Sequence, residues 1–171
     1  MKRIALFFVC LIAFSLPAFA QHGTEGYFGF AHETGVVGKN GWNLSGAYQL
    51  APNFAAEADF GGYYGTHDGS GNSDNTHTFV FGPKIFKTHK RSHLTPFGHL
   101  LFGFAHNHDG NREPDQGATS FAFMLGGGGD YNLSPKLSFR AKADLVHTHF
   151  FHEGQSNLRV GIGLVYHFGA K

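Results

Sequence analysis

The segment from residue 157 to residue 168 alternates between apolar and non-apolar side chains with a period of two. One parity is apolar at every position, and the other contains a single apolar residue, Val165. Because successive side chains of a strand point to opposite faces, the segment predicts a strand with one oily face, long enough to cross hydrocarbon when tilted. The apolar parity comprises Leu158, Val160, Ile162, Leu164, Tyr166 and Phe168.

The first 20 residues are organised like a secretory signal peptide. Lys2 and Arg3 precede an apolar run over residues 4–14, and Ala18 and Ala20 put small residues where a signal peptidase reads them. We predict that residues 1–20 are a signal peptide and that residues 21–171 form one mature domain. Cys10 lies in this leader, so we expect no disulfide in the mature chain.

Composition and charge argue against several classes of protein. Removing Lys2 and Arg3 leaves 11 basic residues against 12 acids, so no basic field attracts nucleic acid. Beyond the leader, no apolar stretch approaches the roughly 20 residues of a membrane helix. The 20 Phe and 25 Gly, with only 15% charged residues, favour barrel strands over an ordinary soluble domain, whose surface is usually rich in Lys and Glu.

Alternating segments recur along the whole mature chain, and no window has a sustained helical period. They predict an all-β fold, an eight-stranded antiparallel up-and-down transmembrane β-barrel, with the even strand number of single-chain bacterial barrels. Short and long connections alternate, which predicts short periplasmic turns and longer outer loops. The predicted strands span residues 26–34, 41–50, 54–65, 77–86, 94–106, 118–131, 137–148 and 157–168.

The second parity of these strands predicts what fills the barrel. It is composed of Gly, Ser and Asn with a balanced set of charges. Eight strands leave an interior that side chains nearly fill, and buried charges are tolerable when paired, so we expect an ion-pair network and no open pore. The alternative is that some of these charges face water at a barrel rim. The expected inward charges are Glu57, Asp59, Asp130 and Asp144 with Lys84, Arg140, Lys142 and Arg159.

Three stretches carry a resemblance to a known family: LTPFGHLLFGFAH, LSPKLSFRAKADL and the final LRVGIGLVYHF. The chain resembles the small outer-membrane β-barrel domain family, the eight-stranded OmpA/OmpX-like class, over residues 21–168. The resemblance implies an integral protein of a Gram-negative-type outer membrane. It also implies that the barrel assembly machinery reads the final strand through Tyr166 and Phe168. We expect a non-enzymatic monomer in outer-membrane lipid, with a structural or surface-interaction role and no cofactor.

Histidines near strand ends are candidate metal ligands. Two imidazoles at i, i+2 spacing share one strand face, and imidazoles with carboxylates bind Zn²⁺ or Cu²⁺. The candidates lie near the ends of the predicted strands 94–106 and 137–148, and the predicted strand 118–131 lies between these two, which weakens this geometry. We favour histidines at the lipid headgroup boundary and in wet loops. The candidate ligands are His106, His108, His147, His149 and His152, with Asp109 or Glu153.

Two other stretches carry weaker signals. The loop over residues 65–75 contains Asp68 and Asp74, which suggests calcium, but its Gly, Ser and Asn content is that of any mobile outer loop. The glycines at 126–129 lack the Lys-Ser/Thr ending of a phosphate loop, and we expect them to ease curvature or close packing within a strand.

Two alternative functions stay open. A lipid-modifying outer-membrane enzyme needs a nucleophile with its base in reach. The deacylase-like pattern, a His with Ser two residues later followed by Asn, is not met: Thr148 and His149 follow His147, and Gly154 precedes Ser156. A secreted soluble ligand-binding barrel would share the strand number, but with apolar side chains inside and charges outside. We predict no catalytic, cofactor or metal residues.

Overall fold

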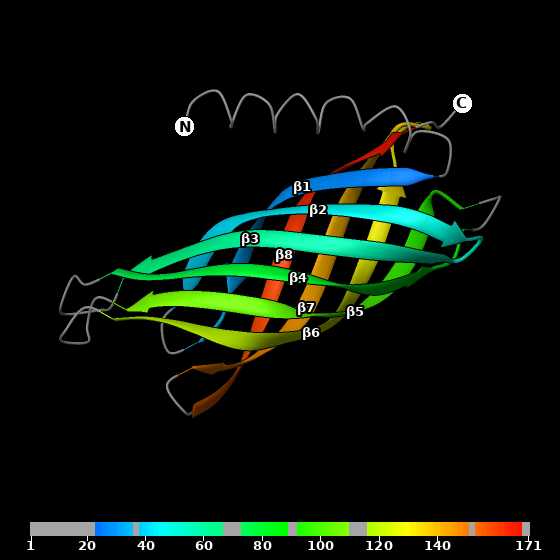
Figure 1. The fold of residues 1–171 in the computed structure, drawn as a ribbon. Coiled ribbons are helices and arrows are strands. Elements are labelled where there is room, and N and C mark those ends of the chain that lie inside the picture. The colour runs from blue at the N-terminus through cyan, green and yellow to red at the C-terminus, as the bar shows by residue number, and fades with distance from the viewer. Residues whose placement is uncertain are drawn as a thin grey trace, which may run out of the picture.

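Eight antiparallel strands form a closed barrel in the computed structural model, which describes residues 23–35, 38–66, 73–88, 92–109, 116–150 and 153–168 (Figure 1). Each strand pairs with its neighbours in sequence, and the first pairs with the last. The predicted all-β, up-and-down topology is therefore confirmed. The strands are β1 (Thr24–Glu33), β2 (Lys39–Ala51), β3 (Phe54–Thr66), β4 (Ser73–Phe86), β5 (Leu94–Asp109), β6 (Gln116–Asn132), β7 (Leu137–Phe150) and β8 (Glu153–Phe168).

The two rims of the barrel are defined by the ends of the strands. We call the rim where β1 begins and β8 ends the terminal rim, and the opposite rim the distal rim. The β2–β3, β4–β5 and β6–β7 connections lie at the terminal rim, and the other four lie at the distal rim. The predicted leader, residues 1–20, lies outside the described residues. No described segment is a helix of the length and apolarity that a membrane crossing needs.

Several strands continue beyond their predicted ends at the distal rim. Backbone pairing persists to Thr66↔Ser73 between β3 and β4 and to Phe150↔Glu153 between β7 and β8. The sequence pattern stopped earlier because the last residues no longer alternate with apolar side chains. The predicted alternation of short and long connections is consequently wrong for the β7–β8 hairpin, where only residues 151–152 separate the strands.

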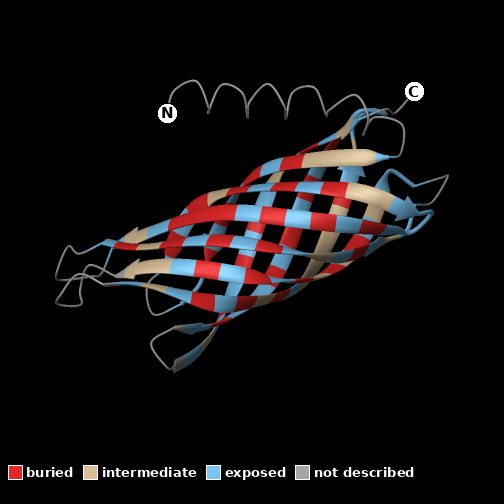
Figure 2. Cartoon of the chain, viewed as in Figure 1, coloured by how far each residue is buried: buried red, intermediate tan, exposed pale blue. Residues whose placement is uncertain are grey.

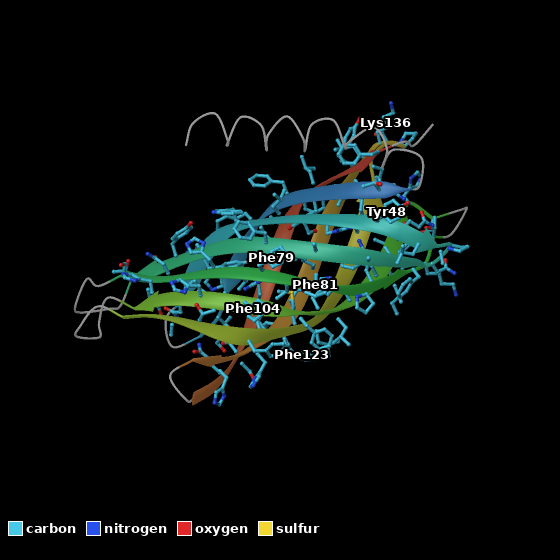
Figure 3. All side chains as sticks on the ribbon, in the orientation of Figure 1. Tyr48, Phe79, Phe81, Phe104, Phe123 and Lys136 are labelled. Atoms are coloured by element: carbon cyan, nitrogen blue, oxygen red, sulfur yellow. The ribbon has the colours of Figure 1, made fainter. Side chains whose placement is uncertain are left out.

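Burial alternates along most of each strand, with one parity facing the barrel interior and the other facing outward (Figure 2). On β8 the apolar parity is the exposed one, as predicted, and Val165 on the opposite parity is fully buried. The outer surface is rich in aromatic rings, and Figure 3 shows Phe79, Phe81, Phe104 and Phe123 around the middle of the barrel. A sheet that is closed leaves no strand edge unpaired.

The interior also contains an apolar side that the sequence pattern did not predict. Six buried residues from β4 to β7 pack into one cluster inside the barrel. The expectation of an inner face made only of Gly, Ser, Asn and charges is therefore wrong for these strands, because their inward positions include large apolar side chains. The cluster consists of Val80, Leu101, Ala105, Ala122, Met124 and Val146.

Candidate functional site

The charged side chains of the interior gather into three groups along the barrel. All eight charges expected inside are buried, each with no more than 4% of its surface exposed. They come from β3, β4, β6, β7 and β8, so residues far apart in sequence meet only because the sheet closes. We call the groups the terminal, middle and distal tiers.

The middle tier is centred on Lys142, whose ammonium group lies 3.0 Å from an Asp59 oxygen and 3.3 Å from an Asp144 oxygen. The Asn43 amide donates a hydrogen bond of 2.8 Å to the other Asp59 oxygen. Lys142, Asp59 and Asp144 are buried. A charge in such a place is tolerated only when its counter-charges and hydrogen bonds are present.

His99 joins two carboxylates in the same tier. Its Nδ1 lies 3.0 Å from Glu57 Oε2, and its Nε2 lies 2.9 Å from Asp144 Oδ1. Ionised carboxylates only accept hydrogen bonds, so both contacts are satisfied when both ring nitrogens carry a proton. The geometry therefore favours an imidazolium, a further cation among the inward charges.

The terminal tier is built around Arg140. Its Nε and Nη2 donate to the two Asp130 oxygens at 2.6 and 2.7 Å, which is a bidentate pairing. Nη2 also donates to Glu25 at 2.7 Å, and Lys84 pairs with the same Glu25 oxygen. The guanidinium lies 4.5 Å from the centroid of the Phe97 ring, which covers its face.

The distal tier contains a second arginine. Arg159 donates from Nε and Nη2 to Glu33 Oε2 at 3.1 and 2.7 Å, and Asn157 donates to Glu33 Oε1 at 3.0 Å. The guanidinium lies 3.9 Å from the centroid of the Tyr63 ring. Beside this group, Lys39 donates to both Asp74 and Thr76 at 2.7 Å.

Four charges of these tiers were missed by the sequence reasoning. Glu25, Glu33, Lys39 and Asp74 all pair inside the barrel, so the expected balance of four acids and four bases is wrong. Among the described residues, the carboxylates of the tiers outnumber the Lys and Arg side chains by two, and a protonated His99 reduces this excess to one. The carboxylates are Glu25, Glu33, Glu57, Asp59, Asp74, Asp130 and Asp144, and the cations are Lys39, Lys84, Arg140, Lys142 and Arg159.

Two pockets of very different volume lie at the two ends of the barrel interior. A pocket of about 640 Å³, which we call the vestibule, opens at the terminal rim, and Glu25, Lys84 and Asp130 of the terminal tier line it. The pocket beside the distal tier, lined by Glu33 and Arg159 among others, has a volume of only about 10 Å³. Of these two pockets, the one at the terminal rim is by far the larger.

Outside the barrel, an aromatic residue and a small polar residue face each other at all four distal hairpins. In three of them a histidine Nδ1 lies 2.9 Å from an oxygen of the residue directly opposite: His32 with Asn40, His106 with Thr119, and His147 with Ser156. In the fourth, Tyr64 stands opposite Asn75. We call these four pairs the distal girdle.

The proposed metal ligands are not brought together. His106 and His108 lie on β5, His147 and His149 lie on β7, and β6 separates the two strands, as the sequence had suggested. His106 instead faces His77 of β4. Among the described residues, no group of three His, Cys, Asp or Glu side chains could hold a metal ion. His152 and the side chains of Asp109 and Glu153 lie outside the described part.

The structure places two hydroxyls beside histidines, which the sequence pattern did not indicate. Ser156 lies within hydrogen-bond distance of His147, and Ser138 Oγ lies 2.8 Å from His167 Nε2. Neither pair forms a complete catalytic arrangement. No described carboxylate contacts His147, and Ser138 is fully buried, so substrate cannot reach it.

The other two weak signals have structural explanations. Residues 126–129 lie inside β6, and a Cβ at Gly126 would stand 2.1 Å from Asp144 Oδ1, which agrees with the expected close packing. Asp74 points inward to Lys39 and thus away from any loop calcium site, whereas Asp68 lies outside the described residues.

Comparison with known proteins identifies the family. The model of the outer membrane protein beta-barrel domain matches residues 6–168. This chain belongs to that family. No curated protein sequence matches the chain. The apolar residues on the outer face of the barrel are exposed, as they are in a barrel that lipid surrounds. A soluble barrel would instead have its apolar residues inside, so this arrangement disfavours that alternative.

Solved structures share the fold of this outer-membrane barrel at low sequence identity. Neisserial surface protein A is 9% identical with a TM-score of 0.66, and the match covers 84% of this chain and 95% of that one. OprG from Pseudomonas aeruginosa is 15% identical with a TM-score of 0.61, covering 88% and 97%. Ail, the attachment invasion locus protein of Yersinia pestis, in complex with the heparin analogue sucrose octasulfate, is 14% identical with a TM-score of 0.56, covering 85% and 99%.

Proposed function

We propose that this outer-membrane barrel is a monomeric, non-enzymatic surface protein whose polar interior is closed to ion flow. The observation that carries the proposal is the set of three paired tiers between the vestibule and the distal rim. An ion that crossed would have to separate buried partners such as Arg140 and Asp130, which is costly in a low-dielectric interior.

Conductance across a planar lipid bilayer tests this proposal. The purified barrel, inserted and shown to migrate faster on a gel when unboiled, is expected to give no large steady open channel. Protein-free bilayers and bilayers exposed to the unfolded chain are the controls. A steady open channel in most insertions would contradict a closed interior.

The distal hairpins are the part that we propose to interact with ligands or surfaces. Strand pairing continues past the girdle, for example at His108↔Gly117 and Thr66↔Ser73, so the hairpins stand on an ordered polar extension of the barrel. This arrangement suits the rim that faces outward, with the terminal rim in the periplasm.

Export and insertion complete the proposed function. Residues 1–20 would direct the chain across the inner membrane, and the barrel assembly machinery would read the last strand. Tyr166 and Phe168 support this role because both are exposed on the outer face, with ring centroids 4.9 Å apart. Outer-membrane lipid would be the constant partner of the inserted protein.

A lipid-ester hydrolase is the second candidate, because His147 and Ser156 are exposed near the distal rim. The same pairing recurs at His32 and Asn40, where an amide replaces the hydroxyl, which favours a structural role. We therefore expect the folded barrel to release no fatty acid from phospholipid or lipid A vesicles. Hydrolysis that is lost in Ser156→Ala and kept in Thr119→Ala would establish the enzyme instead.

A further inference from the structure

The distal girdle lies where the apolar outer face of the barrel ends. One step toward the middle of the barrel, Phe104 pairs with Phe121 below His106 and Thr119. Leu145 pairs with Leu158 below His147 and Ser156, and these four apolar residues are exposed. In a membrane, such a change from apolar to polar side chains marks the level of the lipid headgroups.

The hydroxyl partners orient two of the imidazoles. Thr119 and Ser156 each lie 2.9 Å from Nδ1 of the opposite histidine, and a hydroxyl can donate its proton to that nitrogen. A ring whose Nδ1 accepts this hydrogen bond carries its proton on Nε2. In the described part of the chain, neither Nε2 has a hydrogen-bond partner, so His106 and His147 each present a donor to the surroundings of the barrel.

Glycines keep these donors accessible. The Nε2 edge of His106 lies beside Gly117, where a Cβ would stand 3.0 Å away, and that of His147 lies beside Gly154, where a Cβ would stand 3.7 Å away. Each glycine is two residues before the hydroxyl partner. A Gly-x-Thr or Gly-x-Ser segment whose hydroxyl residue stands opposite a histidine thus occurs in two hairpins. A third version has Asn40 opposite His32 and Gly38 beside the ring.

The charge around the girdle fits an anion. Every Asp and Glu whose side chain the structure describes points into the barrel and pairs there or is buried, so no described carboxylate stands on the outer face beside the imidazoles. A phosphate oxygen at headgroup level is an acceptor of the right charge and height. The lipid headgroups around a membrane barrel provide that acceptor on all sides.

We propose that His106 and His147 bind the phosphate groups of outer-leaflet lipids through Nε2, each at its own hairpin. The inference rests on the proposed placement of the distal rim at the outer surface, and it adds a class of lipid and two residues. The same chemistry makes the distal girdle a lipid-selective surface, in contrast to the apolar band, which contacts any acyl chain.

Native mass spectrometry of the folded barrel tests the proposal. The variant His106→Asn with His147→Asn keeps a donor near the Nδ1 position but lacks Nε2, and His93→Asn at the terminal rim is the matched control. Phosphatidic acid is the probe, and diacylglycerol with the same chains is its phosphate-free counterpart. We expect the double variant to bind phosphatidic acid about tenfold more weakly than the unchanged chain and His93→Asn.

Several outcomes would overturn the proposal. These are equal binding of phosphatidic acid by all three proteins, an equal loss in His93→Asn, a loss of the same size with diacylglycerol, or a requirement for added Zn²⁺. Faster migration without boiling is checked first for each protein, so a failure to form a membrane barrel is recognised separately from a failure to bind phosphate. If the double variant does not fold, the side-chain ¹⁵N resonances of His106 and His147 in the unchanged chain should shift with phosphatidic acid alone, and unchanged resonances would refute the inference.

Discussion

Glycine on the inner face of β5 shows how closely neighbouring strands approach one another. A Cβ at Gly103 would stand 2.0 Å from the Phe79 carbonyl oxygen and 2.8 Å from Val80 Cα, both backbone atoms that cannot move aside. At Gly46, on the outer face of β2, the nearest atom is the Glu25 carbonyl oxygen at 3.9 Å. The same residue type is therefore required at one position and replaceable at the other.

We expect Gly103→Ala to destabilise the barrel by about 1–3 kcal/mol, because the added methyl group forces two strands apart. Gly46→Ala should change the free energy of unfolding by no more than about 0.5 kcal/mol. Urea titration in lipid vesicles, followed by the fluorescence of the sole tryptophan, Trp42, measures both. Equal effects of the two substitutions would show that the strands are not as close as described.

Single residues also show which inward charges a sequence can reveal. Asp59 and Arg140 were assigned inward because their strands alternate clearly. Glu33 was missed because Tyr27, Gly29 and Ala31 precede it on the same parity of β1, so that parity has no polar appearance. Glu25 was missed because it lies before residue 26, where the strand was predicted to begin. The partners of His99 lie 42 and 45 residues away, and only the closed barrel brings them together.

At the scale of strands, the β1–β8 seam closes the barrel, and an ion pair lies directly across it. Glu33 and Arg159 are opposite each other in the register, and two nitrogens of the guanidinium bond the carboxylate. Arg159 is fully buried, so removing the charge of Glu33 leaves a cation with no adjacent carboxylate bonded to it. The seam thus depends on the pair remaining intact.

Glu33→Gln is expected to lower the free energy of unfolding by about 3–5 kcal/mol, because a buried charge loses its partner. Adding Arg159→Met to this variant should recover part of the loss, since the uncompensated cation is then gone. Urea titration in the same vesicles measures both variants. If the double variant were less stable than Glu33→Gln alone, groups other than Glu33 would be what stabilises the buried guanidinium.

The strands themselves were largely predictable, and their distal ends were not. Eight segments with period-two alternation correspond to the eight strands because lipid on one side and a packed interior on the other impose opposite demands on successive residues. Past the girdle both faces are polar, so residues such as Asp74 and His108 carry no alternation, although their backbones stay paired. The alternation of apolar side chains therefore does not indicate how far a hairpin extends beyond the apolar band.

For the whole molecule, the tiers lie between a wide vestibule at the terminal rim and a small pocket near the distal rim. Thr95 lines the vestibule at the terminal rim, whereas Thr78 is buried beside the small distal pocket, with the terminal and middle tiers between Thr78 and the terminal rim. The predicted mature chain, residues 21–171, contains no cysteine, so single cysteines introduced at these positions can be labelled without interference.

We expect Thr95→Cys in the folded barrel to react readily with a sulfonated maleimide, because the vestibule of about 640 Å³ admits the reagent. Thr78→Cys should react only after boiling, since paired charges close the interior from the terminal side and side chains leave about 10 Å³ on the distal side. Mass spectrometry after timed labelling gives the two rates, and the boiled samples show that both cysteines are reactive when exposed. Comparable rates in the folded state would mean that a continuous aqueous path runs through the barrel, and the closed interior would have to be abandoned.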